Sequence, residues 1–426
     1  MDRAVQPTDL LSAVEAARRL EVKPETLYAY VSRGLVRSLP GSKKGRRLYV
    51  AEDVERLRAR HVARAGHGAV AAGALRWGEP VLETALTEID PAAGPRYRGL
   101  SAVGLAEEGV AFEAVAELLW TGELPSPLAP WPPPASEDLA RRALALLPPN
   151  APPLARLASV VPVLAGSDPA RYAASDEADR TRGRRLIRTL AALLPPRLAR
   201  PARASTCPGS VATTLSGSFG LKRRGAQRAL DVTLVLSADH ELNPSTFAVR
   251  VAAATGADLY ACASAGLATL SGPRHGGACD RVEALVAETG RPERAEEVVR
   301  ERSRRGESVP GFGHPLYPDG DPRARVLLDE ARRLSPRPVA ALKILLALVE
   351  AMRRAEREPP TLDAGLVAIS SALGLPAGSA AGLFAVGRMA GWIAHALEQR
   401  SAGFLVRPRA RYVGPEAWRA ASKDRD

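Results

Sequence analysis

Apolar residues recur at helical spacing over most of this chain, and no long alternation of apolar and polar residues competes with them. Proline-rich stretches predict loops at 124–135 and 148–153, because proline lacks a backbone donor and interrupts helices. Around these loops the spacing indicates an all-α region. The predicted helices are 101–108, 112–120, 137–147, 181–194, 221–240, 246–254, 259–270, 293–305, 339–354, 363–373 and 377–399.

The first 65 residues follow a different pattern. Ser12 and Glu15 have the S-x-x-E spacing of a capping box that opens a short helix, and Pro24 is placed to begin a second helix. Residues 36–49 are typical of a basic hairpin, and a third helix is expected over 51–64. The second helix should face inward at Leu27, Tyr30 and Val31 and end at Gly34. This order resembles the winged helix-turn-helix module of MerR and excisionase-type proteins.

The formal charge of the chain is uneven. Of the net charge of +12, residues 1–70 carry +6, with 14 Lys and Arg against 8 Asp and Glu. A basic N-terminal segment favours a nucleic-acid partner. The residues expected to contact DNA are Thr26, Tyr28, Arg33, Lys43, Lys44, Arg46 and Arg47. They supply positive charge that can contact DNA phosphates, but they include no evident set of side chains that would recognise base edges. A role of this module in protein contacts alone therefore stays open.

Composition excludes several classes of protein. No apolar run approaches the roughly 20 residues of a membrane span, and the first residues lack the apolar stretch of a signal peptide. We therefore expect a cytoplasmic protein with no membrane partner. The cysteines are odd in number and widely spaced, which predicts reduced thiols and no metal site at Cys207, Cys262 and Cys279.

Three histidines lie in segments unlike an ordinary helix surface. His240 lies in ADHELN, His275 in GPRHGGA and His314 in VPGFGHP. Histidine can move protons near neutral pH or hold an anion, and the neighbouring glycines allow backbone and ligand to approach closely. Together these segments predict a site. No site signal accompanies the other histidines, which are His61, His67 and, with helical spacing that indicates a structural role, His395.

Four motifs in order carry a family resemblance. The segment 238–282, ADHELNPSTFAVRVAAATGADLYACASAGLATLSGPRHGGACDRV, resembles the central block of citrate synthases and 2-methylcitrate synthases. Further motifs of that family are similar to 89–102 (IDPAAGPRYRGLSA), 309–323 (VPGFGHPLYPDGDPR) and 384–415, which contains FAVGRMAGWIAHALEQ and LVRPRARYVGP. Four separate motifs make a chance resemblance an unsatisfactory explanation.

The resemblance implies an all-α, citrate synthase-like fold of a large and a small helical domain, preceded by a small winged helix-turn-helix domain. The implied boundaries are 1–65 for the winged domain, 66–76 for a Gly- and Ala-rich linker, 77–276 with 377–426 for the large domain, and 277–376 for the small domain. In the family the counterpart of Arg407 reaches the active site of the partner subunit. A homodimer is therefore implied as well.

The same resemblance implies condensation of acetyl-CoA or propionyl-CoA with oxaloacetate, giving citrate or 2-methylcitrate and CoA without a tightly bound cofactor. A Claisen-type step needs a base at the methyl carbon, an acid at the thioester oxygen and a donor to the ketone. The matched motifs assign these roles to Asp363, His275 and His314, in that order. The dicarboxylate, which arginines suit, would be bound by His240, Arg323, Arg388 and Arg407. The adenine end of the acyl-CoA co-substrate would lie against the backbone of Ser308, Val309, Pro310, Gly311 and Phe312.

Two departures from the family pattern flank these groups. Cys279 and Asp280 follow HGGA where the family usually has Asn-Glu, and Thr361 and Leu362 precede Asp363 where the family has Asn-Val. Ala364 also stands where the family has phenylalanine, and the smaller side chains of Cys279, Thr361 and Ala364 predict a slightly roomier pocket. The alternative function is a metabolite-sensing transcription regulator that uses the helical body as a ligand sensor. The complete acid/base set favours the enzyme, and the N-terminal module favours the regulator.

Overall fold

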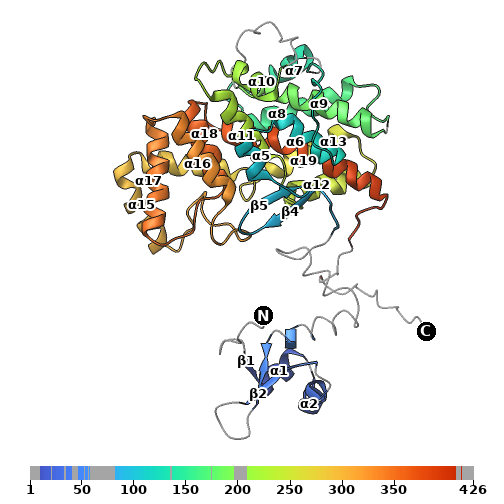
Figure 1. Ribbon diagram of the computed structural model, residues 1–426, viewed down its shortest axis with the longest axis vertical. Helices are drawn as coiled ribbons and strands as arrows, with labels where there is room; N and C mark the ends of the chain where they lie inside the picture. Colours follow the sequence, from blue (N-terminus) through green and yellow to red (C-terminus); the bar gives the residue numbers. More distant parts are fainter. Residues whose placement is uncertain are drawn as a thin grey trace, which may run out of the picture. The chain divides into compact units, whose positions relative to one another are not determined.

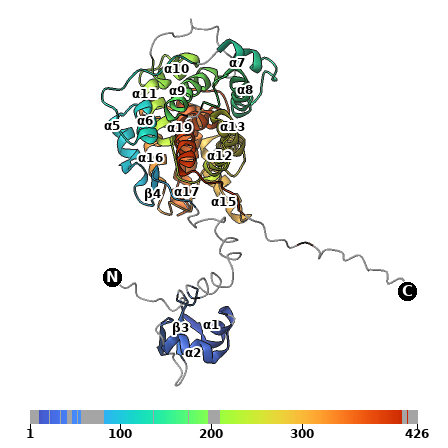
Figure 2. The same ribbon diagram turned by 90° about the vertical axis from the view of Figure 1, so that its right-hand side faces the viewer.

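The computed structural model of the chain describes residues 10–20, 22–32, 35–40, 47–51, 53–55, 57, 82–134, 137–173, 175–195, 209–408 and 414. The chain divides into two compact units, an N-terminal unit of Met1–Glu83 to which Arg409–Asp426 is also assigned, and a helical unit over Thr84–Pro408. Figures 1 and 2 show the N-terminal unit in dark blue and the helical unit in the remaining colours. The chain is mostly helical, which confirms the predicted fold class.

The N-terminal unit combines two short helices with a small antiparallel sheet of strand order β1-β3-β2. Its elements are β1 (Leu10–Ser12), α1 (Ala13–Arg19), α2 (Pro24–Ser32), β2 (Ser38–Pro40) and β3 (Arg47–Val50). Ser12 and Glu15 form the expected capping box, because each side chain accepts a hydrogen bond from the other residue's backbone. The predicted start of α2 at Pro24 and the pairing of the hairpin strands are confirmed, whereas β1 was not predicted.

A small hydrophobic core holds this unit together. Leu27 of α2 is fully buried, and Tyr30 and Val31 pack on the same cluster, as predicted. Tyr28, in contrast, is 54% exposed, and Arg47 at the start of β3 is exposed. Several predicted features lie outside the described residues, namely Arg33, Gly34, Lys43, Lys44, Arg46 and all of the third helix except residues 51, 53–55 and 57, which are helical.

The helical unit contains the predicted helices and others that the pattern missed. Its helices are α5 (Ala102–Glu108), α6 (Phe112–Thr121), α7 (Glu137–Leu144), α8 (Pro153–Ser167), α9 (Asp176–Leu193), α10 (Val211–Ser218), α11 (Ala226–Ser237), α12 (Pro244–Ala254), α13 (Leu259–Leu270), α14 (Ala278–Thr289), η2 (Pro292–Arg294), α15 (Ala295–Arg304), α16 (Pro322–Leu334), α17 (Ala340–Arg354), α18 (Leu362–Leu373) and α19 (Ser379–Ala402). Helices α8, α10, α14 and α16 were not predicted. Helix α8 begins at Pro153, the last residue of an expected loop, because proline at the first helical position loses no intrahelical hydrogen bond.

A small antiparallel sheet precedes these helices, with β4 (Thr87–Asp90), β5 (Gly94–Tyr97) and β6 (Leu100–Ser101) in that order. Strands this short show no alternation along the sequence, and they were not predicted. The buried Tyr97 hydroxyl lies 2.9 Å from the carbonyl oxygen of Val235 and 3.3 Å from that of Asp239. The sheet therefore anchors the chain at the end of α11, directly before His240.

Helix α19 runs through the middle of the helical unit (Figures 1 and 2). A Cβ atom on Gly387 would lie 2.8 Å from Ser237 Cβ, and one on Gly391 would collide with Asp239. The two glycines thus let α19 lie directly against the end of α11, where the Gly391 amide donates to the carbonyl of Ala238 at 3.0 Å. Among the described helices α19 alone is long and apolar enough to cross a membrane, but its apolar window is 100% buried inside the unit, as in a core helix.

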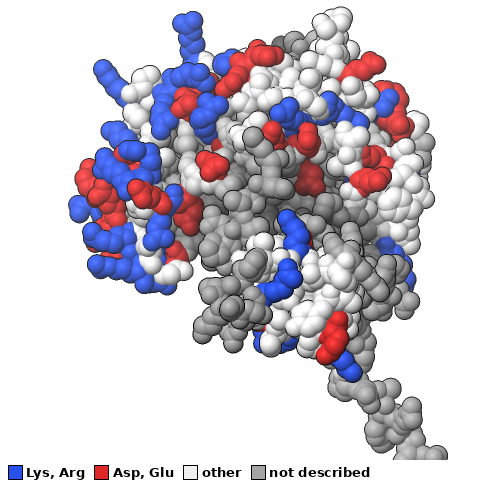
Figure 3. All heavy atoms as spheres, turned by 60° about the horizontal axis from the view of Figure 1, so that its bottom comes forward, with Lys and Arg blue, Asp and Glu red and all other residues white. Residues whose placement is uncertain are grey.

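Charged side chains are interleaved on the face of the molecule in Figure 3. On the side where α15 and α17 lie, Arg354 pairs with Glu296 at 2.7 Å and with Glu350 at 2.9 Å. Arg302 of α15 is likewise 3.4 Å from Glu307. Part of the positive charge on this side of the helical unit is therefore paired with carboxylates.

Candidate active site

Turns and helix ends that are far apart in the sequence meet in the helical unit. His240 follows α11, His314 precedes α16, and their ring centroids lie 5.6 Å apart. The Tyr317 ring lies between 5 and 6 Å from both, with centroid distances of 5.6 Å to His240 and 5.0 Å to His314. The Arg323 guanidinium lies 5.5 Å from the Tyr317 ring centre. Three residues predicted for the site are thus neighbours, and Tyr317, which was not predicted, connects them.

A second group of side chains adjoins the first. The Phe384 ring of α19 lies edge-on to His275, with 6.1 Å between ring centroids, and the Arg388 guanidinium lies 4.8 Å from the same ring. The charges of Arg388, Arg323 and the other two histidines all act on His240. The structure therefore gathers the predicted histidines and two predicted arginines in one place.

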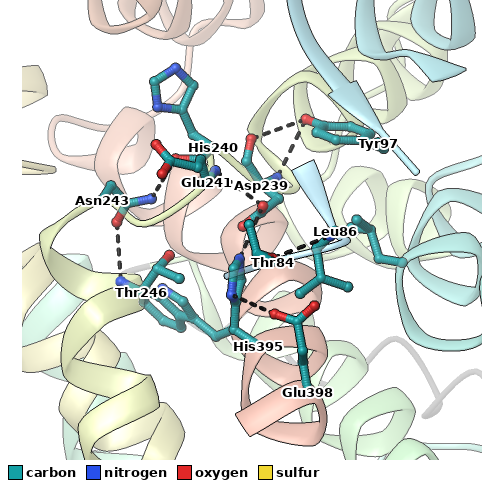
Figure 4. Close-up of polar contacts among 12 residues, drawn as sticks. Thr84, Leu86, Tyr97, Asp239, His240, Glu241, Asn243, Thr246, His395 and Glu398 are labelled. Atoms are coloured by element: carbon teal, nitrogen blue, oxygen red, sulfur yellow. Dashed lines mark hydrogen bonds and ion pairs between the residues drawn. The ribbon is translucent and has the colours of Figure 1, made fainter. Parts of the chain in front are cut away.

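His240 lies on a tight turn between α11 and α12 (Figure 4). Glu241 adopts a left-handed backbone with φ 51, and Asn243 caps α12 by accepting from its backbone at 3.1 Å. Next to the turn, Asp239 Oδ2 lies 3.3 Å from Nε2 of the fully buried His395. His395, predicted to be structural, thus holds the residue that precedes His240.

The environment of His240 keeps its imidazole neutral. Its Nε2 lies 2.8 Å from the Tyr317 hydroxyl, and the side chain is almost entirely buried. Burial is the largest cause that lowers its pKa well below the ordinary value, and the positive charges of Arg323 and Arg388 lower the pKa further. A neutral imidazole beside two cations is suited to donate a hydrogen bond to an anionic ligand.

His275 is held by the glycine-rich turn before α14. A Cβ atom on Gly276 would lie 2.6 Å from Leu270 Cγ, so only glycine fits there. The Ser245 hydroxyl lies 2.8 Å from Nε2 of His275. This contact occupies Nε2 and leaves Nδ1 as the nitrogen for a ligand. Burial, followed by the charge of Arg388, lowers the pKa of His275 to about 4, so its ring is also neutral at pH 7.

The loop that carries His314 is paired with the segment before α18. The Thr361 amide donates to the carbonyl of Gly311 at 2.8 Å, and the Gly313 amide donates to that of Pro359 at 2.9 Å. Gly311 has φ +84, and a Cβ atom there would lie 2.6 Å from Val282 Cγ2. His314 Nδ1 accepts from a backbone amide at 3.2 Å, which places the proton of the neutral ring on Nε2. The pairing couples this loop to the segment that leads into Asp363.

Asp363 lies in the first turn of α18 with its carboxylate between two uncharged donors. Cys279 Sγ lies 3.3 Å from Oδ1, and Thr361 Oγ1 lies 3.2 Å from Oδ2. Burial is the largest influence on its pKa and raises it above the ordinary value, although both donors and Arg323 act in the opposite direction. A carboxylate with a raised pKa is a better proton acceptor than an exposed one.

Two buried arginines supply positive charge to the same region. Arg323 makes hydrogen bonds to Asp321 of 3.0 Å through Nε and 2.8 Å through Nη2, while its buried Nη1 has no hydrogen-bond partner among the described residues. Arg388 donates from Nε to the carbonyl of Ser237 at 2.9 Å. Burial lowers the pKa of Arg388 to about 10, so it stays charged at pH 7. The unsatisfied Nη1 and the only partly compensated charge of Arg388 suit an anion.

Arg407 does not join these residues within one chain. It lies beyond the end of α19, and its side chain is exposed. Among the residues that the structure describes, no hydrogen bond or ion pair joins Arg407 to the site described above. Its role in the site of a partner subunit stays a prediction.

A cavity of about 550 Å³ opens beside His314. Of the backbone segment predicted to hold coenzyme A, Ser308, Val309 and Phe312 line it, and Pro310 and Gly311 do not. On its other side the cavity is lined by residues of α17 and of the segment after it, among them Met352 and Arg357. Among the described residues no group of three or more His, Cys, Asp or Glu is arranged to hold a metal ion.

Two regions of the chain match known protein families. A family model described as citrate synthase, C-terminal domain, matches residues 74–409. A second, described as MerR HTH family regulatory protein, matches residues 11–68. The two matches coincide with the regions in which the sequence resembled these families.

Individual relatives agree with the family matches. Citrate synthase 2 of Bacillus subtilis is 38% identical over 190 residues, which are 44% of this chain and 51% of the relative. The chain thus matches about half the length of that relative. A 2-methylcitrate synthase of Mycobacterium tuberculosis is 30% identical over 349 residues, 78% of this chain and 88% of the relative.

A solved structure shows a similar architecture. The ternary complex of carboxymethyl coenzyme A and oxaloacetate with citrate synthase from Thermoplasma acidophilum superposes with a TM-score of 0.67 at 26% identity. The superposition covers 80% of this chain and 95% of that chain.

Proposed function

Because the chain belongs to the citrate synthase family, we propose that its helical unit condenses acetyl-CoA or propionyl-CoA with oxaloacetate, giving citrate or 2-methylcitrate and CoA. The observation that carries the proposal is the convergence of two neutral histidines, a carboxylate with a raised pKa and two buried arginines. These groups supply a base, hydrogen-bond donors and anion binding within one site.

In the proposed reaction Asp363 takes a proton from the methyl or methylene carbon next to the thioester carbonyl. His275 donates to the thioester oxygen as negative charge develops there. The resulting enol carbon attacks the ketone carbon of oxaloacetate while the enol proton returns to His275 and the thioester carbonyl re-forms. The ketone oxygen receives a proton from His314, and exchange with solvent later restores that proton and removes the one held by Asp363. A new carbon–carbon bond then joins the two substrates in a thioester intermediate. Water cleaves that thioester, which releases the carboxylate product and the free thiol of CoA.

The proposal assigns the oxaloacetate carboxylates to His240, Arg323 and Arg388, with Arg407 of a second subunit completing the site. It is supported by the free Nη1 of Arg323 and by the exposed position of Arg407. A homodimer follows from this assignment. No tightly bound cofactor takes part, since acyl-CoA is a co-substrate.

Coenzyme A is proposed to bind along residues 308–312, where the cavity beside His314 would receive it. We retain the proposed boundaries of a large domain over 77–276 with 377–426 and a small domain over 277–376. With these boundaries, His275 and Arg388 belong to the large domain, and Asp363 and His314 to the small one. The substrates would therefore meet where the two domains face each other.

The N-terminal unit is proposed to bind DNA through α2 and the basic hairpin. The match of residues 11–68 to MerR-type regulatory proteins and the local charge of +6 support this role. The second candidate function, a regulator that senses oxaloacetate or acyl-CoA, rests on the same match. Under either candidate function, we place the protein in the cytoplasm.

Free-thiol release from acetyl-CoA and from propionyl-CoA in the presence of oxaloacetate separates the two candidates. The enzyme should release thiol from at least one acyl-CoA, and Asp363→Asn should suppress the release. Binding of both substrates without any thiol release would favour the regulator and contradict the proposed reaction.

A further inference from the structure

Each oxygen of the Asp363 carboxylate has its own donor. Cys279 on the first turn of α14 reaches Oδ1 at 3.3 Å, and Thr361 directly before α18 reaches Oδ2 at 3.2 Å. Both donor residues are buried, Cys279 completely. An ionised carboxylate can only accept hydrogen bonds, so the thiol and the hydroxyl must both point their hydrogens toward it.

The Cys279 thiol stays protonated in this position. Burial raises its pKa well above the ordinary value, and the charge of Asp363 raises the pKa further. Asp280 and Glu283, on the same helix, act in the same direction. A thiol that does not ionise is a poor nucleophile and a poor metal ligand, but it remains an S–H donor.

We infer that Cys279 and Thr361 are positioning residues for the base, which fix the direction of the Asp363 carboxylate and tune its affinity for the substrate proton. The inference rests on the proposed role of Asp363. Both donors also stand where this sequence departs from the family pattern, which has asparagine at each of the two positions. Uncharged donors orient the carboxylate without the strong stabilisation of its charge that an arginine or lysine would add.

Other charged groups face Asp363 but do not hold it. Arg323 favours the ionised carboxylate, and Asp321, which accepts from the Leu362 amide at 3.2 Å, opposes it. Among the described residues Asp363 takes part in no ion pair within 4.0 Å. The two neutral donors are therefore its direct contacts, and a change in donor strength should be visible in its titration.

The thiol allows a test in which two substitutions act in opposite directions. A hydroxyl donates a stronger hydrogen bond than a thiol. Because hydrogen bonds to the ionised form lower the pKa of a carboxyl, Cys279→Ser should lower the pKa of Asp363 and Cys279→Ala should raise it. We expect shifts of about 0.5 to 1 pH unit each way. On the other oxygen, Thr361→Val should raise the pKa, and Thr361→Ser should leave it unchanged.

The titration is measured by ¹³C NMR of aspartate-labelled full-length protein, with the Asp363 carboxyl signal assigned by its loss in Asp363→Asn. The acid limb of the pH profile of kcat should move with the NMR pKa. Cys262→Ser is the matched control. Cys262 is also buried, at 1% exposed, but its Sγ contacts a backbone carbonyl oxygen at 3.7 Å and not the Asp363 carboxylate. Neither readout should move in that variant.

Shifts of the same sign in Cys279→Ser and Cys279→Ala would indicate packing alone and overturn the inference. So would an Asp363 titration that does not respond to Cys279→Ala and Thr361→Val. If the wild type releases no thiol while the NMR pKa shifts as expected, the effect of the donors on Asp363 is supported and the proposed function fails. If the wild type is active and the titration does not respond, the inference alone fails.

Discussion

The helical unit and the N-terminal unit present their functional candidates in opposite environments. In the helical unit Arg388 is 1% exposed and His240 is 8% exposed, and a buried charge is costly unless an opposite charge completes its surroundings. In the N-terminal unit the described candidates Tyr28 and Arg47 are exposed, and Thr26 is half-buried. The first arrangement suits a small anion removed from water, and the second suits a polyanion met at the surface.

The charge balance of the two regions differs in the same way. Arg302 of α15 and Arg354 of α17 are paired with carboxylates, whereas the 70 residues at the N-terminus carry half of the chain's net charge of +12. Long-range attraction for nucleic acid is therefore expected from the N-terminal region. A substitution that abolishes catalysis by the helical unit should therefore leave DNA binding by the N-terminal unit intact. A substitution that abolishes DNA binding should likewise leave catalysis intact.

The largest effect is expected from Asp363→Asn, which keeps the shape of the side chain but removes the proposed base. Turnover should fall by about 10²–10⁴-fold, because general base catalysis contributes that much. The measurement is thiol release by purified protein, with thermal unfolding to verify the fold. DNA retention by the same variant should equal that of the wild type. Near-normal turnover would rule out the assigned role.

Arg407→Ala should reduce kcat/KM for oxaloacetate by about 10²-fold, because a desolvated carboxylate would lose a charge-assisted partner. If Arg407 acts across a dimer interface, mixing this variant with Asp363→Asn subunits should restore activity, since one site of each heterodimer keeps both residues. The control is a mixture with Asp363→Asn,Arg407→Ala subunits, which cannot form such a site. Failure to recover activity under demonstrated subunit exchange would contradict a shared site.

Local signals in the sequence were sufficient for much of the fold. The capping box at Ser12 and the start of α2 at Pro24 depend on neighbours within one helical turn, and both are confirmed. Helix α13 has the predicted bounds, Leu259–Leu270. Helix α8 was missed because its first residue, Pro153, was assigned to the loop 148–153, and a further proline, Pro162, lies inside the helix. Its apolar face is buried against the rest of the unit, so packing outweighs the proline penalty.

The candidate site was predicted through its motifs, but its internal contacts were not. The Cys279–Asp363 contact joins residues 84 positions apart, and the Tyr317–His240 contact joins residues 77 positions apart. Such distances in sequence leave no periodic signal. Tyr317 could have been suspected, because it lies in the same matched segment as His314. The role of Cys279 required the fold, since the sequence showed only that an expected asparagine was missing.

A smaller effect is expected from removing the positive charge of the hairpin. Changing Lys43, Lys44, Arg46 and Arg47 to alanine should weaken duplex DNA binding at all sequences and flatten the slope of log affinity against log salt by up to about 3.6 if each contacts one phosphate. The matched control removes four exposed arginines from the helical unit through Arg300→Ala, Arg304→Ala, Arg332→Ala and Arg353→Ala. Thiol release should not change in the hairpin variant. Equal loss of DNA binding in both variants would remove the distinction between the two units.

The smallest effect is expected in the acid stability of the helical unit. The pKa of His275 is lowered to about 4 in the folded protein, against about 6.5 in an unfolded chain. Between these values the unfolded chain binds a proton that the folded site does not, so the histidine's contribution to stability falls as the pH drops from 6.5 toward 4. His275→Gln removes this titration and should make the midpoint of thermal unfolding less dependent on pH over that range, by a few degrees. His67→Gln, at a histidine whose sequence context carries no site signal, is the control and should follow the wild type. If the pH dependence of the unfolding midpoint were the same in His275→Gln as in the wild type, the site would not hold this imidazole neutral. The contrast between the desolvated site of the helical unit and the exposed residues of the N-terminal unit would then lose its support at His275.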